Sequence, residues 1–253
     1  MKKLFISLII LLSVLVSLIF ISSNNQVTAL SENSNSLDTV KSSEPQTTYT
    51  FKNLFQNEPI IDSSGVDTII DAYNYKSYYD WDIKQPIYVK YILYKGGGEC
   101  DRSNFRFKND TKIKMATAKD YAGSGFDMGH LANAEDFAYD CFSGERTFRF
   151  YNCLPQYPNL NRGVWKRWEN KVREWSQTDS LLVVCGGKFS DKKIGNGVYV
   201  PEYCWKVVYS IRSNHILKVL WFKNVEKDAE KNFEEISIYK LRENLGYDII
   251  LSY

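Results

Sequence analysis

Two stretches of the chain contain the residue types that hydrolytic chemistry uses. The first, residues 124–136, holds His130, one of only two histidines in 253 residues, with Asp127 and Asp136 on either side and glycines around it. A neutral imidazole suits a general base that takes a proton from water near neutral pH. Glycines let the backbone approach a ligand closely. This stretch alone leaves two interpretations open, a catalytic base or a histidine satisfied inside a core.

The second stretch, residues 161–175, has the period of a helix. Asn161 lies at its start, and Glu169 follows two turns later, about 80° round the helix. An amide oxygen and a carboxylate suit Mg²⁺, which accepts few protein ligands and keeps several waters. The ordinary alternatives are an N-cap for Asn161 and a solvated face for Glu169. The helical period comes from apolar residues at spacings of three and four: Val164, Trp165, Trp168, Val172 and Trp175.

The same helix is basic. The basic residues of a helix usually form only a solvated face. Next to a candidate site with a metal and a histidine, the alternative that they face phosphate becomes more credible. The acidic residues are Glu169 and Glu174, and the basic ones are Arg162, Lys166, Arg167, Lys171 and Arg173.

Strands before and after helices, without regular βαβ alternation, predict an α+β fold with a mostly antiparallel central sheet flanked by helices. Residues 100–106 are predicted to form a loop whose arginines can point at a ligand, and His215 is predicted to start a strand. A second helix is predicted at 233–245, with Gly246 as its C-cap. The predicted strands are residues 86–94, 181–184, 198–200, 205–211 and 215–222.

The N-terminus has the pattern of a targeting segment. Two lysines precede an apolar run over residues 4–21, and Ala29 ends a small-residue cleavage pattern. Residues 1–29 are therefore predicted to be a signal peptide or an N-terminal membrane anchor. Residues 30–48 are predicted to be a disordered polar linker, and residues 49–253 one catalytic domain. Either form of the N-terminus predicts a secreted domain or one anchored outside the cytosol.

The net charge and the cysteines limit the class of protein and the compartment in which it folds. A formal net charge of +2 argues against a histone-like polycation. The globular part holds five cysteines, of which some should pair in an oxidising compartment while the odd number leaves at least one unpaired. Cys185, inside an apolar run, is expected to be a buried core thiol. No cysteine or histidine spacing suggests zinc.

With Asp136, residues 123–132 resemble the signature of the DNA/RNA non-specific endonucleases, the ββα-metal nucleases that include endonuclease G. The family pattern is Asp-Arg-Gly-His followed by an apolar stretch and an Asp. A second block, Asn152, Pro155 with Gln156, and residues 161–169, resembles the family's Asn, Pro-Gln and Asn-x-x-x-Trp-x-x-x-Glu. Residues 102–105 resemble an upstream Arg and Phe segment. The similarity covers roughly residues 73–250.

This resemblance implies a role for each matching residue. His130 would be the general base that activates water, and Asn161 would bind Mg²⁺ directly. Glu169 would hold water bound to the metal. Arg102 would stabilise the pentacoordinate phosphate, and Asn152 would support the site. Mn²⁺ or Ca²⁺ could substitute for Mg²⁺.

We assign substrate binding to Asp127, Arg162 and Arg167. The partners would be the phosphodiester backbones of DNA and RNA, with little sequence specificity and 5′-phosphates as products. The sequence leaves the oligomeric state open.

The chain departs from the family pattern at Met128, where the family usually has Arg. Met cannot supply a planar guanidinium to phosphate. Another arginine, Arg106, Arg146 or Arg149, could occupy that space. If none does, a second function class stays open: a catalytically weak or silent secreted or surface module that binds nucleic acid or other polyanions.

Overall fold

An antiparallel sheet carries the other elements of the fold. The computed structural model describes residues 65–249 and 251, all within the unit Thr47–Tyr253. In this part the main sheet has seven strands in the order β1-β2-β3-β6-β7-β8-β9, which confirms the predicted antiparallel α+β architecture. The strands are β1 Thr68–Asp71, β2 Lys76–Asp80, β3 Gln85–Leu93, β6 Leu181–Ile194, β7 Val198–Ser210, β8 His215–Lys223 and β9 Phe233–Glu235.

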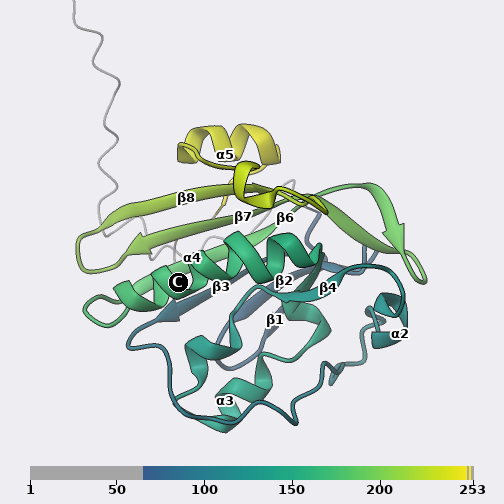
Figure 1. The fold of residues 1–253 in the computed structure, drawn as a ribbon, viewed down its shortest axis with the longest axis horizontal. Coiled ribbons are helices and arrows are strands. Elements are labelled where there is room, and N and C mark those ends of the chain that lie inside the picture. Colours follow the sequence, from purple (N-terminus) through teal and green to yellow (C-terminus); the bar gives the residue numbers. More distant parts are fainter. Residues whose placement is uncertain (1–64, 250, 252–253) are drawn as a thin grey trace, which may run out of the picture. The chain divides into compact units, whose positions relative to one another are not determined.

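Helices cover both faces of this sheet, so its central strands are apolar on both sides. Residues 181–187 of β6 are all buried. Val183 packs into the core that faces α4 (Lys166–Trp175), and its neighbour Val184 packs into the core under α5 (Ile238–Leu245). Figure 1 shows α5 on one side of the strands and α4 on the other. The continuous apolar run in the sequence thus reflects a strand buried on both faces.

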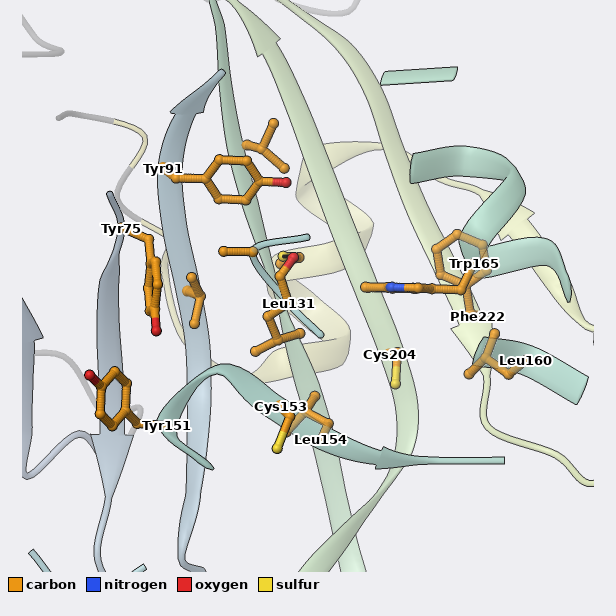
Figure 2. Close-up of a cluster of buried hydrophobic side chains, with 14 of the residues drawn as sticks. Tyr75, Tyr91, Leu131, Tyr151, Cys153, Leu154, Leu160, Trp165, Cys204 and Phe222 are labelled. Atoms are coloured by element: carbon orange, nitrogen blue, oxygen red, sulfur yellow. Dashed lines mark hydrogen bonds between the residues drawn. The ribbon is translucent and has the colours of Figure 1, made fainter. Parts of the chain in front are cut away.

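A small second sheet holds the histidine stretch. It pairs β4 (Asp127–His130) with β5 (Cys153–Gln156), antiparallel, with Asp127 opposite Gln156 and His130 opposite Cys153. A π-helical turn, η4 (Leu160–Trp165), follows and continues into α4. The chain therefore forms two short strands and a helix around one core. Figure 2 shows Leu154 of β5 in this core and Trp165 beside Phe222 of the main sheet.

The structure corrects two predicted elements. The two predicted strands at 198–200 and 205–211 are one strand, β7, which ends at Ser210. Pro201 and Tyr203 both pair with β6, across a shift in register, and pairing with β8 begins at Tyr203. The predicted helix over 233–245 begins as strand β9, and its helical part starts only after Ser237, whose side chain caps the amide of Lys240. Its predicted end at Gly246 is confirmed, with φ at 81°.

Five shorter helical turns complete the described chain. The predicted start of a strand at His215 is confirmed, whereas β1 and β2 were not predicted. The short turns are α2 Ala118–Tyr121, η2 Ala134–Phe137, α3 Cys141–Arg146, η3 Phe150–Asn152 and η5 Ala229–Lys231.

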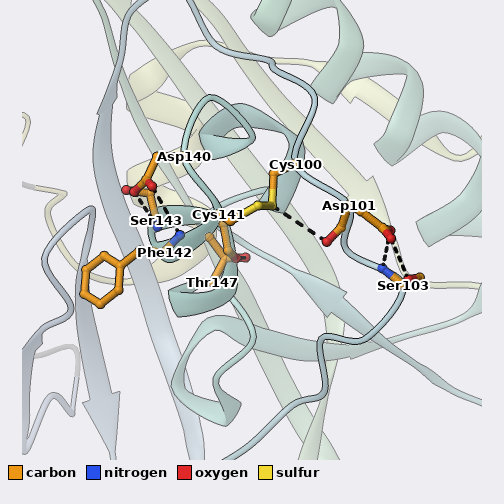
Figure 3. The surroundings of a disulfide bond; sticks show 9 residues. Cys100, Asp101, Ser103, Asp140, Cys141, Phe142, Ser143 and Thr147 are labelled. Atoms are coloured by element: carbon orange, nitrogen blue, oxygen red, sulfur yellow. Dashed lines mark hydrogen bonds between the residues drawn. A yellow bond between two sulfur atoms is a disulfide. The ribbon is translucent and has the colours of Figure 1, made fainter.

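One disulfide, Cys100–Cys141, joins the loop after β3 to the first residue of α3 (Figure 3). Cys153, Cys185 and Cys204 are free and buried, so the predicted core thiol at Cys185 is confirmed. Its Sγ lies 3.2 Å from the carbonyl oxygen of Leu131.

The predicted segments 1–29 and 30–48, the start of the domain at 49–64, and the apolar run at 4–21 all lie outside the described residues. Within 65–249 and 251, no helix is both long enough and apolar enough to cross a membrane.

Candidate active site

Asp127, at the start of β4, joins the strand to the helical turn that carries Asn161. Its carboxylate accepts a hydrogen bond of 2.9 Å from Asn161 Nδ2. It also accepts two from Arg162, from Nε at 2.8 Å and Nη2 at 2.6 Å. A carboxylate only accepts hydrogen bonds, so it fixes which end of the Asn161 amide faces it. Asn161 Oδ1 therefore points away from Asp127 and keeps its lone pairs for another partner.

A single oriented amide oxygen fits a hard cation that keeps most of its water shell, as Mg²⁺ does. Within the described residues, no group of three or more His, Cys, Asp and Glu side chains could hold a metal. The Asn161 oxygen and the Glu169 carboxylate are thus the candidate protein contributions to a metal centre, with water completing the coordination. The kink at Gly163 (φ −100°, ψ −112°) breaks the regular helix between them, so the 80° expected for an ideal helix does not apply.

His130 is the last residue of β4, and two aromatic rings hold its imidazole. Phe107 and Phe148 each lie 4.7 Å from it, centroid to centroid, Phe148 edge-on. Nε2 is shielded from solvent and has no hydrogen-bond partner, so Nδ1 is the nitrogen left to face water. Burial, and secondarily the charge of Arg102, lowers the pKa of His130 to about 3. The imidazole is therefore neutral at neutral pH, as a proton acceptor must be.

Arg102 approaches His130 from the loop that follows β3. It forms a 2.5 Å ion pair with Glu135 of η2, and both side chains are about one-third exposed. Loop residues on either side are anchored. The disulfide and a hydrogen bond from the Cys100 amide to the carbonyl oxygen of Ala138 hold one end of the loop. At the other end the backbone of Lys108 forms a β-bridge with that of Arg149. Arg102 is thus a partly exposed cation held beside the imidazole, which suits contact with phosphate.

Asn152 acts on the main chain. Its side chain is fully buried, and its oxygen accepts from the amide of Ala132 at 2.8 Å. Its Nδ2 donates to the carbonyl oxygens of Ala132 and Thr147 at 2.9 and 2.8 Å. Two of these contacts hold Ala132, two residues after His130, and the third holds Thr147 at the end of α3. Asn152 therefore fixes the backbone next to His130, which is compatible with the supporting role that the resemblance implies.

Glu169 lies in a buried group of charges. Its exposed fraction is 6%, and burial raises the pKa of its carboxyl, while Lys206 and a hydrogen bond from Asn133 act in the opposite direction. Lys206 is 1% exposed and its Nζ lies 4.3 Å from the centroid of the Trp165 ring. Trp165 is one turn before Glu169 and donates from Nε1 to His130 O at 3.3 Å. The hydrogen bond from Trp165 to His130 therefore joins the helical segment that carries Glu169 to strand β4.

Asp136 and Arg173 could be named from the sequence, but their contacts with each other and the burial of Lys206 were not predicted. Asp136 accepts hydrogen bonds from Tyr91 at 2.9 Å and from Arg173 Nε at 3.0 Å. Arg173 also donates to Asn133 at 3.3 Å. A signal was present for Lys206, because a lysine inside an otherwise apolar strand is rarely buried without a partner.

The two arginines that were predicted to bind substrate, Arg162 and Arg167, lie in different parts of the structure. Arg162 is exposed and paired with Asp127. Arg167 lies elsewhere on the helix: it pairs with Glu230 and sits over Phe233. In the described residues, Arg167 shares no hydrogen bond or ion pair with any other predicted site residue.

The side chains of the arginines suggested as substitutes at Met128 make no hydrogen bond or ion pair to a predicted site residue in the described chain. Arg149 is buried between Asp110 and Glu145. Arg146 bonds the carbonyl oxygen of Ala72, and Arg106 bonds those of Ser103 and Phe105. Met128 itself packs against the core.

Comparisons with known proteins agree with this arrangement. A crystal structure of an EndoG/EndoGI complex has the same fold, with a TM-score of 0.64 at 22% identity over 75% of this chain and 88% of that chain. A nuclease of Nostoc sp. is 31% identical over 147 residues, which cover 51% of this chain and 52% of that protein. Human mitochondrial endonuclease G is 36% identical over 128 residues, 44% of this chain and 43% of that protein.

Two short strands and a helix that carry a histidine and an asparagine define the class, a ββα-metal nuclease fold. The family model for DNA/RNA non-specific endonucleases matches residues 56–249, and the chain belongs to that family. It spans about half the length of the curated relatives it matches.

Proposed function

We propose that this chain is an exported, Mg²⁺-dependent endonuclease that hydrolyses DNA and RNA with little sequence specificity and leaves 5′-phosphates. One observation supports this most: Asp127 orients the Asn161 amide so that its oxygen is free, on the same strand that ends in His130. A proton acceptor and an oriented metal ligand on one pair of strands and the helix that follows are what metal-assisted hydrolysis needs.

Each site residue has a separate role in the proposed hydrolysis. Asn161 Oδ1 would hold the metal, and Glu169 would hold water bound to it. The ion would neutralise charge on the phosphate and on the leaving 3′ oxygen. His130 takes a proton at Nδ1 from the attacking water, while Phe107 and Phe148 fix the plane of its ring. Arg102 donates to the phosphate oxygens with N–H groups that its pair with Glu135 does not use.

Export is part of the proposal. The predicted signal or anchor supports it, and so does the Cys100–Cys141 disulfide, because such bonds persist in oxidising compartments. N-terminal sequencing of secreted protein tests it: a start near Leu30 supports cleavage after Ala29, and a reduced cytosolic form contradicts export.

A plasmid-nicking assay with and without EDTA tests the activity. The parent protein should nick and linearise plasmid with Mg²⁺ and stop when EDTA is added. His130→Ala and Asn161→Ala should be folded and nearly inactive. The missing family arginine at Met128 favours a second candidate, a module that binds nucleic acid without cleaving it. Binding of plasmid without nicking would support that candidate.

A further inference from the structure

Lys192 stands out among the exposed cations near the site because its ammonium is held in place by aromatic groups and not by an acid. Its Nζ lies 4.9 Å from the ring centroid of Phe126 and 5.0 Å from that of Tyr157. It also donates a 2.8 Å hydrogen bond to the Tyr157 hydroxyl. The two rings pack against each other with their centroids 4.3 Å apart. The lysine side chain is therefore ordered before any ligand arrives.

This aromatic pair directly adjoins the candidate metal ligand. Phe126 precedes Asp127, and Tyr157 follows Gln156, the residue paired with Asp127 across the two short strands. The carbonyl oxygen of Tyr157 accepts the amide of Asn161 at 2.9 Å. Lys192 itself belongs to β6. Its ammonium thus lies over the two rings next to Asp127 and Gln156, at one end of the two short strands.

Its charge is not neutralised locally. Within residues 65–249 and 251, no carboxylate lies within ion-pair distance of Lys192, although Asp191 is its neighbour in sequence. Arg162, the other exposed cation here, is bound to Asp127 through two hydrogen bonds. An ammonium that is held by such contacts and lacks an acidic partner binds an anion with a smaller loss of side-chain freedom than a free lysine does.

We propose that Lys192, held by Phe126 and Tyr157, binds a phosphate of the nucleic-acid strand next to the one that is cleaved. This rests on the proposed function for its substrate and adds a contact outside the catalytic residues. Contacts of this kind carry no sequence information, because they meet the backbone only.

The test measures binding separately from cleavage. The full chain is titrated in EDTA with a fluorescent duplex oligonucleotide at several salt concentrations, and Kd is read by anisotropy. Each phosphate contact contributes about 0.9 to the slope of log K against log salt on B-DNA. Lys192→Met keeps the aliphatic stem over the rings and should lower that slope by about 0.9. Lys192→Arg should restore it.

Lys193→Met is the matched control, because it removes the same charge from the adjacent residue, whose Nζ lies over Tyr199 at 4.2 Å. Its slope should stay close to that of the parent. Equal losses in both variants, no loss in Lys192→Met, or no salt-dependent binding by the parent would each overturn the assignment. If Lys192→Met alone loses slope while the parent never cleaves with Mg²⁺, the phosphate contact stands and the proposed hydrolysis falls.

Discussion

Asp127 gives the sharpest test of the site, because its role is visible only in the structure. The sequence predicts that Asp127 binds substrate, and in the structure its carboxylate accepts hydrogen bonds from Asn161 Nδ2 and from Arg162. Asp127→Asn is nearly isosteric, but it puts one amide N–H₂ where two donors already point. At least one of these charge-assisted bonds is then lost, and the Asn161 amide is free to turn its nitrogen toward the metal position.

The size of the effect follows from that bond. A hydrogen bond to a charged group contributes about 1.5–3 kcal/mol, and each 1.4 kcal/mol is about a tenfold change in an equilibrium constant. Asp127→Asn should therefore weaken Mg²⁺ binding by about 10- to 100-fold. At saturating Mg²⁺ most of kcat should return, since His130 and Arg102 are untouched.

The assay is the Mg²⁺ concentration for half-maximal nicking, with the Mg²⁺ Kd of the same samples measured by calorimetry. Arg162→Gln is the control, because it keeps the bond from Asn161. Arg162 is mostly exposed, and such ion pairs contribute about 0–1 kcal/mol, so the shift should stay below about fivefold. An Asp127→Asn protein with the parent's Mg²⁺ dependence would refute the orienting role, as would a larger shift in Arg162→Gln.

Three further predictions follow from the same geometry. His130→Ala should fold normally and lose about 10²- to 10⁴-fold in kcat, and full activity would remove His130 from the mechanism. Burial lowers the pKa of His130 from 6.5 to about 3, so the unfolded chain binds the proton first. The stability from neutral His130 is present above about pH 6.5 and is lost as pH falls toward 3. Thermal unfolding of His130→Gln should show a smaller loss over this range, and identical curves would contradict it. Reducing Cys100–Cys141 should lower the free energy of unfolding by about 2–4 kcal/mol and lower kcat/KM through the loop that holds Arg102. A Cys100→Ser, Cys141→Ser double variant should no longer respond to reductant. Full activity of the reduced parent would contradict the idea that the disulfide positions the loop that carries Arg102.

The sequence by itself determined the family and the sheet class, and it named the candidate site residues. His130, Asn161 and Glu169 each have an ordinary alternative use, so they could be singled out only because the motifs that contain them occur together in the order of the family pattern. Apolar periodicity predicted the helix at 161–175 and the strands around it, since burial of one face or two leaves a repeating pattern. It failed at β9 and across β7, where polar residues are held in strands by pairing with neighbours distant in sequence.

Only the tertiary structure decided which charges meet. Asp127 and Asn161 are 34 residues apart, and Lys192 reaches Tyr157 across 35. Neither pairing leaves a local pattern, because one carboxylate or ammonium can serve many partners. The fold selects among them by crossing α4 over the sheet and turning the β6–β7 hairpin toward β4. The same crossing places Lys206 against Trp165, near the carboxyls of Asp136 and Glu169. Burial raises the pKa of both carboxyls, and the charge of Lys206 opposes that rise. A charge can stay buried there only where the fold supplies its counter-charge.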